Sequence, residues 1–125
     1  MENCLTCILI EDEALGIEMM EDYISRRDDL KLLGTAIQLS EIEYLLTTSS
    51  PSIIFLDLII PYGDQNDFNF SKFPKSSSFI VTSAIPISHF NGELPPGKIY
   101  ELLKPISFKN FNMCVDKVVQ RIKSS

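Results

Sequence analysis

The sequence predicts an α/β fold: a doubly wound sheet of five parallel strands in the spatial order 2-1-3-4-5. Short apolar runs alternate with helix-like segments along the whole chain, which is typical of a parallel α/β sheet. Residues 53–56 are apolar on both faces, as expected for a central strand that helices cover on each side. Three of the apolar runs end at an acid or a lysine, which indicates a polar site at one edge of the sheet.

Size and charge limit the possible functions. The chain has 125 residues, and we expect a single domain over residues 1–125. Its net charge of -6 argues against direct nucleic-acid binding by this segment, because such proteins present a basic face. No apolar run approaches the roughly 20 residues that cross a bilayer, and the N-terminus lacks the features of a secretory signal. We therefore expect a cytoplasmic protein with no membrane partner.

The strands and the first two helices are predicted from the spacing of apolar residues. The expected strands are residues 5–10, 30–36, 53–56, 79–82 and 99–103. A helix is expected over residues 14–26, with its apolar side chains three and four residues apart. A second helix is expected over residues 40–48, where Ser40 as N-cap and Glu43 form a capping box.

The second half of the chain is less regular until its last helix. A short helix is expected over residues 68–73, before Pro74. Residues 86–97 contain Asn-Gly and Pro-Pro-Gly sequences, so the fourth helix is expected to be short or irregular. The last helix is predicted to begin after Ser107, its N-cap. Its apolar stripe consists of Phe111, Val115, Val118 and Ile122.

Charged side chains follow three of the predicted strands. Glu11 and Asp12 follow the first strand, Asp57 the third and Lys104 the fifth. In this topology the carboxyl ends of the strands share one edge, and ligands bind where the strand order reverses between strands 1 and 3. Three carboxylates there would repel one another unless a cation lay among them. Mg²⁺ prefers such oxygen ligands, so the sequence predicts a magnesium site.

Asp57 is the candidate nucleophile of this edge. A carboxylate can accept a phosphoryl group and hold it as an acyl phosphate. Because such a transfer needs its charge neutralised, Lys104 would supply a positive charge to a phosphate oxygen. The hydroxyl of Ser83, at the end of the fourth strand, is a candidate ligand of another oxygen.

Four stretches of the sequence resemble the receiver domain of two-component response regulators. They are CILIEDE at residues 7–13, IFLDLIIP at 54–61, IVTSA at 80–84 and LLKPISF at 102–108. The resemblance covers essentially the full length and implies the flavodoxin-like fold of CheY-like receivers. The residues around 13–15 and 104–107 and the last helix look most like receivers attached to LytTR-type DNA-binding domains.

The resemblance implies a role for each residue of the metal site. A sensor histidine kinase would phosphorylate Asp57 with the help of Mg²⁺. Asp12 would bind the metal directly, and Glu11 would act through a bound water. The backbone carbonyl of Ile59 would complete the protein ligands.

The resemblance also implies how the phosphoryl group is held and read. Ser83 would close on it and Lys104 would pair with it. The Lys104–Pro105 peptide bond is expected to be cis, an isomer usually reserved for a fixed functional turn. Such a domain is a phosphoacceptor and not an enzyme, apart from catalysing its own phosphorylation and dephosphorylation.

Partners and output are expected from the same resemblance. The phosphorylated domain would control an attached output, of the LytTR DNA-binding type, and so regulate transcription. We expect that effector portion to lie outside these 125 residues. A homodimer would form through the face made of the fourth helix, the fifth strand and the last helix.

Two departures from the family pattern leave a second hypothesis open. Glu101 occupies the position of the aromatic switch residue, and Tyr100 is predicted to point to the opposite face of the strand. The helix before the last strand is interrupted by prolines. A protein–protein interaction module that works without phosphorylation would fit these features.

The Cys4–Cys7 pair has the CxxC spacing of redox and zinc proteins. A redox pair requires the first thiol at a helix N-terminus, whereas this pair enters a strand. A zinc site would need two further ligands, and only Cys114 and His89 are available. We therefore predict structural cysteines and a surface position for His89.

Overall fold

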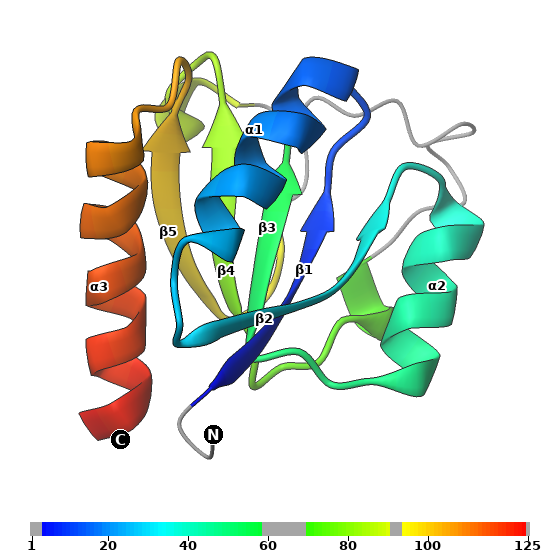
Figure 1. Ribbon diagram of the computed structural model, residues 1–125. Coiled ribbons are helices and arrows are strands. Elements are labelled where there is room, and N and C mark those ends of the chain that lie inside the picture. Colours follow the sequence, from blue (N-terminus) through cyan, green and yellow to red (C-terminus); the bar gives the residue numbers. More distant parts are fainter. Residues whose placement is uncertain (1–3, 59–69, 91–93, 125) are drawn as a thin grey trace.

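Five parallel strands form one sheet in the order β2-β1-β3-β4-β5, as predicted (Figure 1). The computed structural model describes residues 4–58, 70–90 and 94–124. The strands are β1 (Leu5–Ile10), β2 (Leu30–Ala36), β3 (Ile53–Asp57), β4 (Ser78–Ser83) and β5 (Lys98–Leu103). The helices are α1 (Ala14–Ser25), α2 (Leu39–Thr48) and α3 (Phe108–Ser124), with short 3-10 turns η2 (Phe70–Lys72) and η3 (Ile87–His89).

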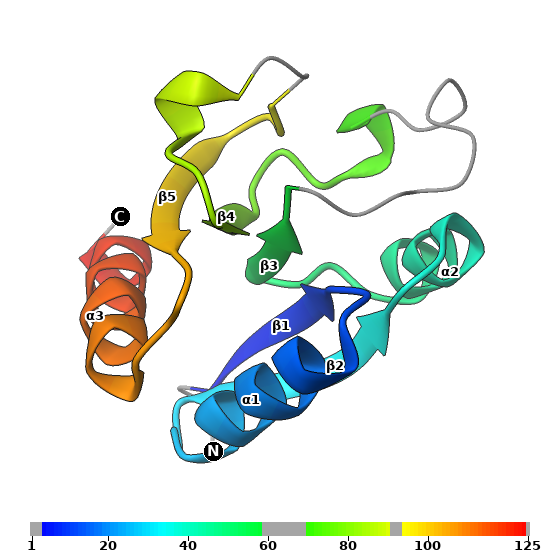
Figure 2. The same cartoon turned by 90° about the horizontal axis from the view of Figure 1, so that it is seen from above.

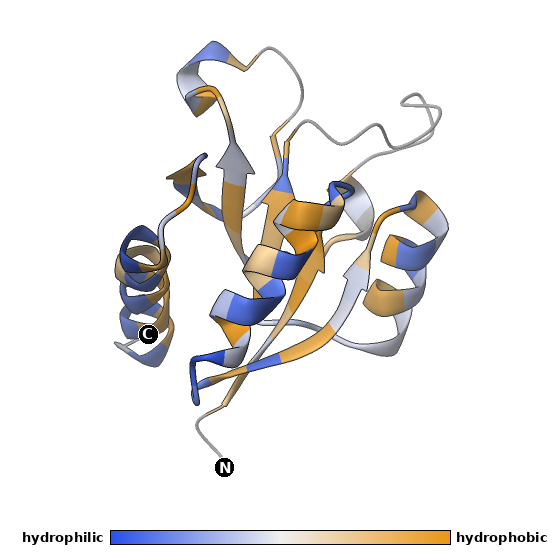
Figure 3. Ribbon diagram, turned by 45° about the horizontal axis from the view of Figure 1, so that its top comes forward, coloured by the Kyte–Doolittle hydropathy of each residue, from blue (hydrophilic) through white to orange (hydrophobic). Residues whose placement is uncertain are grey.

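Helices cover the two faces of the sheet unequally. Figure 2 shows α1 and α3 on one face and α2 on the other. Because helices cover both faces of the sheet, the side chains on both faces of the central strands are apolar. Figure 3 shows that hydrophobic residues are concentrated on the central strands.

Each face of the sheet has its own hydrophobic core. The face under α1 and α3 packs Leu9, Met20, Phe55, Phe111 and Val115 together with their neighbours. The face under α2 packs Ile8, Ile42, Leu56, Phe73 and Phe79. The alternation of Ile8 and Leu9 between the two cores follows from the two-residue period of a strand. The two cores therefore fix the positions of the strand ends from which the residues of the candidate site extend.

The start of α2 differs from the prediction. The helix begins at Leu39 and is capped by Gln38, so Ser40 lies inside it and the predicted box with Glu43 is wrong. The carboxylate of Glu41 accepts the backbone N–H groups of Ile37 at 2.7 Å and Gln38 at 2.9 Å. Those bonds satisfy the N–H of the N-cap and of the residue before it, and they lower the pKa of Glu41. The acid two residues earlier than predicted therefore sets the helix start.

The segment between β4 and β5 is irregular, as predicted. Among the residues described there, the helical part is η3, a turn of three residues. By contrast, α3 is regular, and the N–H of Asn110 donates to Ser107 Oγ at 3.0 Å, which confirms the predicted cap. The predicted apolar stripe also faces the core, because Phe111 and Val118 are fully buried. Within the described part of the chain, no helix combines the length and apolarity that a membrane span needs.

The cysteines belong to the core and its edge. Cys7 is fully buried in β1, and burial, together with the nearby Cys4, raises the pKa of its thiol to about 12. Burial likewise raises the pKa of Cys114, in α3, to about 11. All three cysteines are free thiols. A buried thiol that stays protonated is a poor nucleophile and a poor metal ligand, in agreement with the structural role predicted.

Candidate functional site

The candidate site lies beyond the carboxyl ends of β1 and β3, the two adjacent strands at which the strand order reverses. Ile10 is in register with Leu56, so the residues that follow, Glu11 and Asp57, leave the sheet at the same level. Both side chains are nearly inaccessible, with exposed fractions of 2% for Glu11 and 5% for Asp57. The two acids are therefore forced together by strand pairing.

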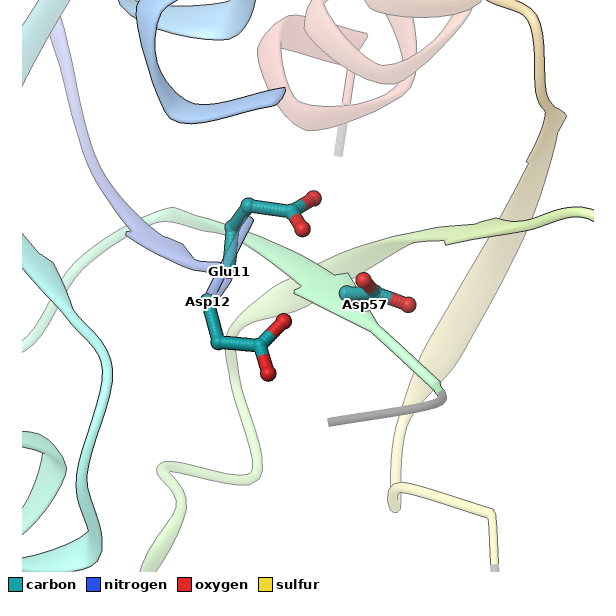
Figure 4. Close-up of side chains that lie close together, drawn as sticks. All are labelled: Glu11, Asp12 and Asp57. Carbon is teal, nitrogen blue, oxygen red and sulfur yellow. The ribbon is translucent and has the colours of Figure 1, made fainter. Parts of the chain in front are cut away.

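Three carboxylates converge at this edge (Figure 4). Glu11 and Asp12 extend from the end of β1, and Asp57 stands at the end of β3. One oxygen from each of the three lies within 4.8 Å of the others. Asp12 is exposed whereas the other two are buried, so the cluster opens to solvent on the side of Asp12.

Lys104 joins the cluster from the opposite side of β4. Its Nζ lies 3.0 Å from Asp57 Oδ2 and 3.5 Å from Glu11 Oε1. The backbone N–H of Lys104 donates to the carbonyl of Ser83 at 2.9 Å, which fixes the end of β5 against the end of β4. The Lys104–Pro105 peptide bond is cis.

The charges of the site oppose one another. Burial raises the pKa of Glu11 first, and the adjacent Asp57 carboxyl raises it further through a hydrogen bond and its charge, to about 7. Lys104 and the Glu13 N–H, 3.3 Å from Glu11 Oε2, offset this only in part. Partial burial alone would lower the pKa of Lys104, but Asp57 and Glu11 raise it above its ordinary value. One ammonium group thus leaves the three acids under-neutralised.

The donor set fits a small divalent cation. All three acids offer oxygen, which hard cations prefer over nitrogen and sulfur. The exposed side of Asp12 leaves room for the water molecules that Mg²⁺ retains. A cation there would relieve the repulsion that raises the pKa of Glu11. The Ile59 carbonyl, predicted as a further ligand, lies outside the described residues.

Comparison with known proteins places the fold. No family model matches the sequence. The transcriptional regulatory protein CitT of Bacillus subtilis is 27% identical over 107 residues, which cover 82% of this chain and 47% of that protein. The response regulatory domain of MrkE from Klebsiella pneumoniae superposes with a TM-score of 0.72 at 18% identity, covering 97% of this chain and 100% of that one.

The chain has the fold of response-regulator receiver domains. PhyR, an anti-anti-sigma factor from Bartonella quintana, gives a TM-score of 0.75 at 16% identity, over 98% of this chain and 51% of that one. The matched regions span 24% and 47% of two curated relatives, so each match covers less than half of the relative's length.

Ser83 occupies the end of β4. It is fully buried, and its Oγ accepts the N–H of Ile85 at 3.1 Å. Register places Thr82 opposite Asp57, so Ser83 is one position farther along the edge. The hydroxyl is therefore held by the loop that follows β4, and its rotation would release the N–H of Ile85.

Glu101, the residue predicted at the switch position, forms a polar tether between two elements. Its carboxylate accepts the N–H of Ile87 at 2.7 Å, which ties β5 to the start of η3. Tyr100 faces the core under α1 and α3 instead, as strand alternation predicts. Sequence reasoning missed this tether, because an acceptor bond across 14 residues leaves no local pattern.

Loss of the Glu101 tether is expected to loosen η3. In Glu101→Ala the N–H of Ile87 loses a charge-assisted hydrogen bond, so its hydrogen exchange should accelerate by about tenfold. Glu101→Gln keeps a carbonyl acceptor and should retain most of the protection. Amide exchange measured by NMR would test this, and equal rates in both variants would contradict it.

A second anchor, also missed, stands behind Lys104. The hydroxyl of Tyr23 in α1 donates to the carbonyl of Ile106 at 2.9 Å. The Tyr23 ring packs against Phe108 and Phe111, with centroid distances of 5.3 and 5.4 Å. The loop that carries Lys104 is thus fastened to α1 two residues beyond the lysine. The apolar spacing of α1 gave no sign of this hydroxyl contact.

Proposed function

We propose that this chain is the phosphoryl-accepting receiver domain of a two-component response regulator, with Asp57 as the acceptor. The observation that carries the proposal is the Lys104 ammonium 3.0 Å from Asp57, opposite two further carboxylates. This arrangement pairs a nucleophilic oxygen with a fixed positive charge and with ligands for a divalent cation. A sensor histidine kinase is the proposed donor.

The residues of the site have distinct roles in the proposed transfer. An Asp57 oxygen forms a bond to phosphorus while the bond to the donor's leaving atom breaks. The leaving group departs with the electron pair and takes up a proton, as the imidazole of a phosphohistidine would. Lys104 neutralises a phosphoryl oxygen, and Mg²⁺ held by Glu11, Asp12 and Asp57 would neutralise another.

The proposed signal begins at Ser83. Phosphorylation adds nearly two negative charges at Asp57, which favours rotation of the Ser83 hydroxyl toward them. That rotation would give up the bond to the N–H of Ile85 and so alter the segment that Glu101 holds at Ile87. The proposed output is an attached effector that regulates transcription, for which the LytTR type is our finer proposal.

A small phosphodonor tests the acceptor directly. Incubation with acetyl phosphate and Mg²⁺ should add the mass of one phosphoryl group to the intact protein, and Asp57→Asn should gain none. Glu13→Gln, which alters a nearby exposed acid, serves as the matched control and should be labelled like the wild type. An unchanged mass in the wild type, or equal labelling of Asp57→Asn, would refute the proposal.

The second candidate is an interaction module that works without phosphorylation. Two observations favour it: Glu101 in place of an aromatic residue and the three-residue η3 between β4 and β5. Such a module would bind its partner equally well before and after treatment with acetyl phosphate. Binding that is lost in Asp57→Asn would exclude it.

A further inference from the structure

Gly16 lies directly against the buried carboxylate of the candidate metal site. It is the third residue of α1, where its missing side chain faces Glu11. A Cβ built there would lie 3.1 Å from Glu11 Cδ and 3.3 Å from each of the two carboxylate oxygens. These distances are shorter than ordinary van der Waals contacts, so any larger residue would push the carboxylate aside.

The Glu11 carboxylate has little freedom to yield. Its exposed fraction is 2%, Oε1 faces Lys104 Nζ at 3.5 Å, and Oε2 accepts the Glu13 N–H at 3.3 Å. A carboxylate pushed away from α1 would therefore change its position relative to Asp57 and Lys104.

A glycine inside a helix is otherwise unfavourable. It is less stable there than alanine because it loses more backbone entropy on folding. The φ angle of Gly16 is not in the left-handed region, so its backbone conformation does not require glycine. The close approach of Glu11 remains as the physical reason for a glycine at this position.

We propose that Gly16 is a positioning residue for Glu11. A glutamate carries its carboxylate one methylene farther from the backbone than an aspartate. The space above Gly16 accommodates that extra length and lets the carboxylate join Asp12 and Asp57. This inference deepens the proposed function, on which its metal-binding part rests. It predicts that residues 11 and 16 are coupled. Gly16→Ala should weaken Mg²⁺ binding when residue 11 is glutamate and should leave it nearly unchanged when residue 11 is aspartate.

A double-mutant cycle on the full chain tests this coupling through Mg²⁺ affinity. Calorimetric titration should show Mg²⁺ binding weakened by about tenfold in Gly16→Ala. Adding Gly16→Ala to Glu11→Asp should change the affinity less than about twofold, because the shorter acid withdraws from the new methyl group. Leu15→Ala, an exposed change in the same turn, is the control and should bind like the wild type.

Thermal unfolding in EDTA gives a second readout that needs no metal. Gly16→Ala should raise the Tm by roughly 3 °C in the Glu11→Asp background, as helix propensity requires, and should fail to raise it beside Glu11. If the wild type binds no Mg²⁺, the proposed metal site fails while this Tm comparison still decides the coupling. Equal effects of Gly16→Ala in both backgrounds, in either readout, would overturn the inference.

Discussion

Raising the pH from 5 to 8 without divalent cations is expected to destabilise the protein through Glu11. Its pKa is raised from 4.5 to about 7 in the folded state. Between those values folded Glu11 keeps a proton that the unfolded chain releases, so the folded state binds more protons. The free energy of unfolding therefore falls as the pH rises through this window, by on the order of 2 kcal/mol for this one group.

Chemical denaturation in EDTA at several pH values measures this slope. Glu11→Gln, which cannot ionise, should flatten the curve and be more stable than the wild type at pH 8. Mg²⁺ should restore stability most strongly at high pH, because a cation binds the ionised carboxylates and only the folded state gathers them. A wild-type curve that matches Glu11→Gln across the whole range would contradict the assigned shift.

Replacement of Lys104 is expected to slow phosphorylation strongly even though the acceptor Asp57 is kept. Its ammonium contacts both Asp57 and Glu11, and its side chain is only 26% exposed, so solvent cannot replace that charge well. In Lys104→Met the phosphoryl oxygens lose a fixed positive partner, and the rate of labelling by acetyl phosphate should fall about 100-fold. A time course followed by intact mass measures that rate.

The change in overall charge needs a control. Lys109→Met removes one positive charge from the exposed start of α3 and should leave the labelling rate within about twofold of the wild type. The Lys104→Met protein should still fold, which the near-UV spectrum would verify. Equal labelling rates for the two variants would show that Lys104 plays no part in the transfer.

The sheet and the acids at its edge could be predicted because strand signals are local and the doubly wound topology determines which strands are neighbours. The Asp57 carboxylate follows an apolar run, and a reversal of strand order between β1 and β3 dictates which acid lies beside it. The five strands accordingly differ from prediction by at most one residue at either end. The early start of α2 escaped prediction because Gln38 with Glu41 and Ser40 with Glu43 both have the spacing of a capping box, and only the approach of the chain decides between them.

The contacts that tune the site were not predictable in this way. The bonds from Tyr23 to Ile106 and from Ile87 to Glu101 join different elements, so neither spacing nor composition indicates them. The space at Gly16 is likewise visible only once α1 is seated over the end of β1. Helix propensity alone marks that glycine as unfavourable, whereas the adjacent Glu11 carboxylate explains why no larger residue stands there.

The Tyr23 anchor bears on how variants in the first helix are to be interpreted. A substitution on α1 that slows phosphorylation by a protein donor has two explanations. It could remove a contact with that donor, or it could disturb the bond from Tyr23 to the Ile106 carbonyl and so displace Lys104. Acetyl phosphate separates them, since so small a donor touches no helix surface. If the variant is also phosphorylated slowly by acetyl phosphate, the defect lies inside the domain. If acetyl phosphate restores the normal rate, the substituted residue contacts the protein donor.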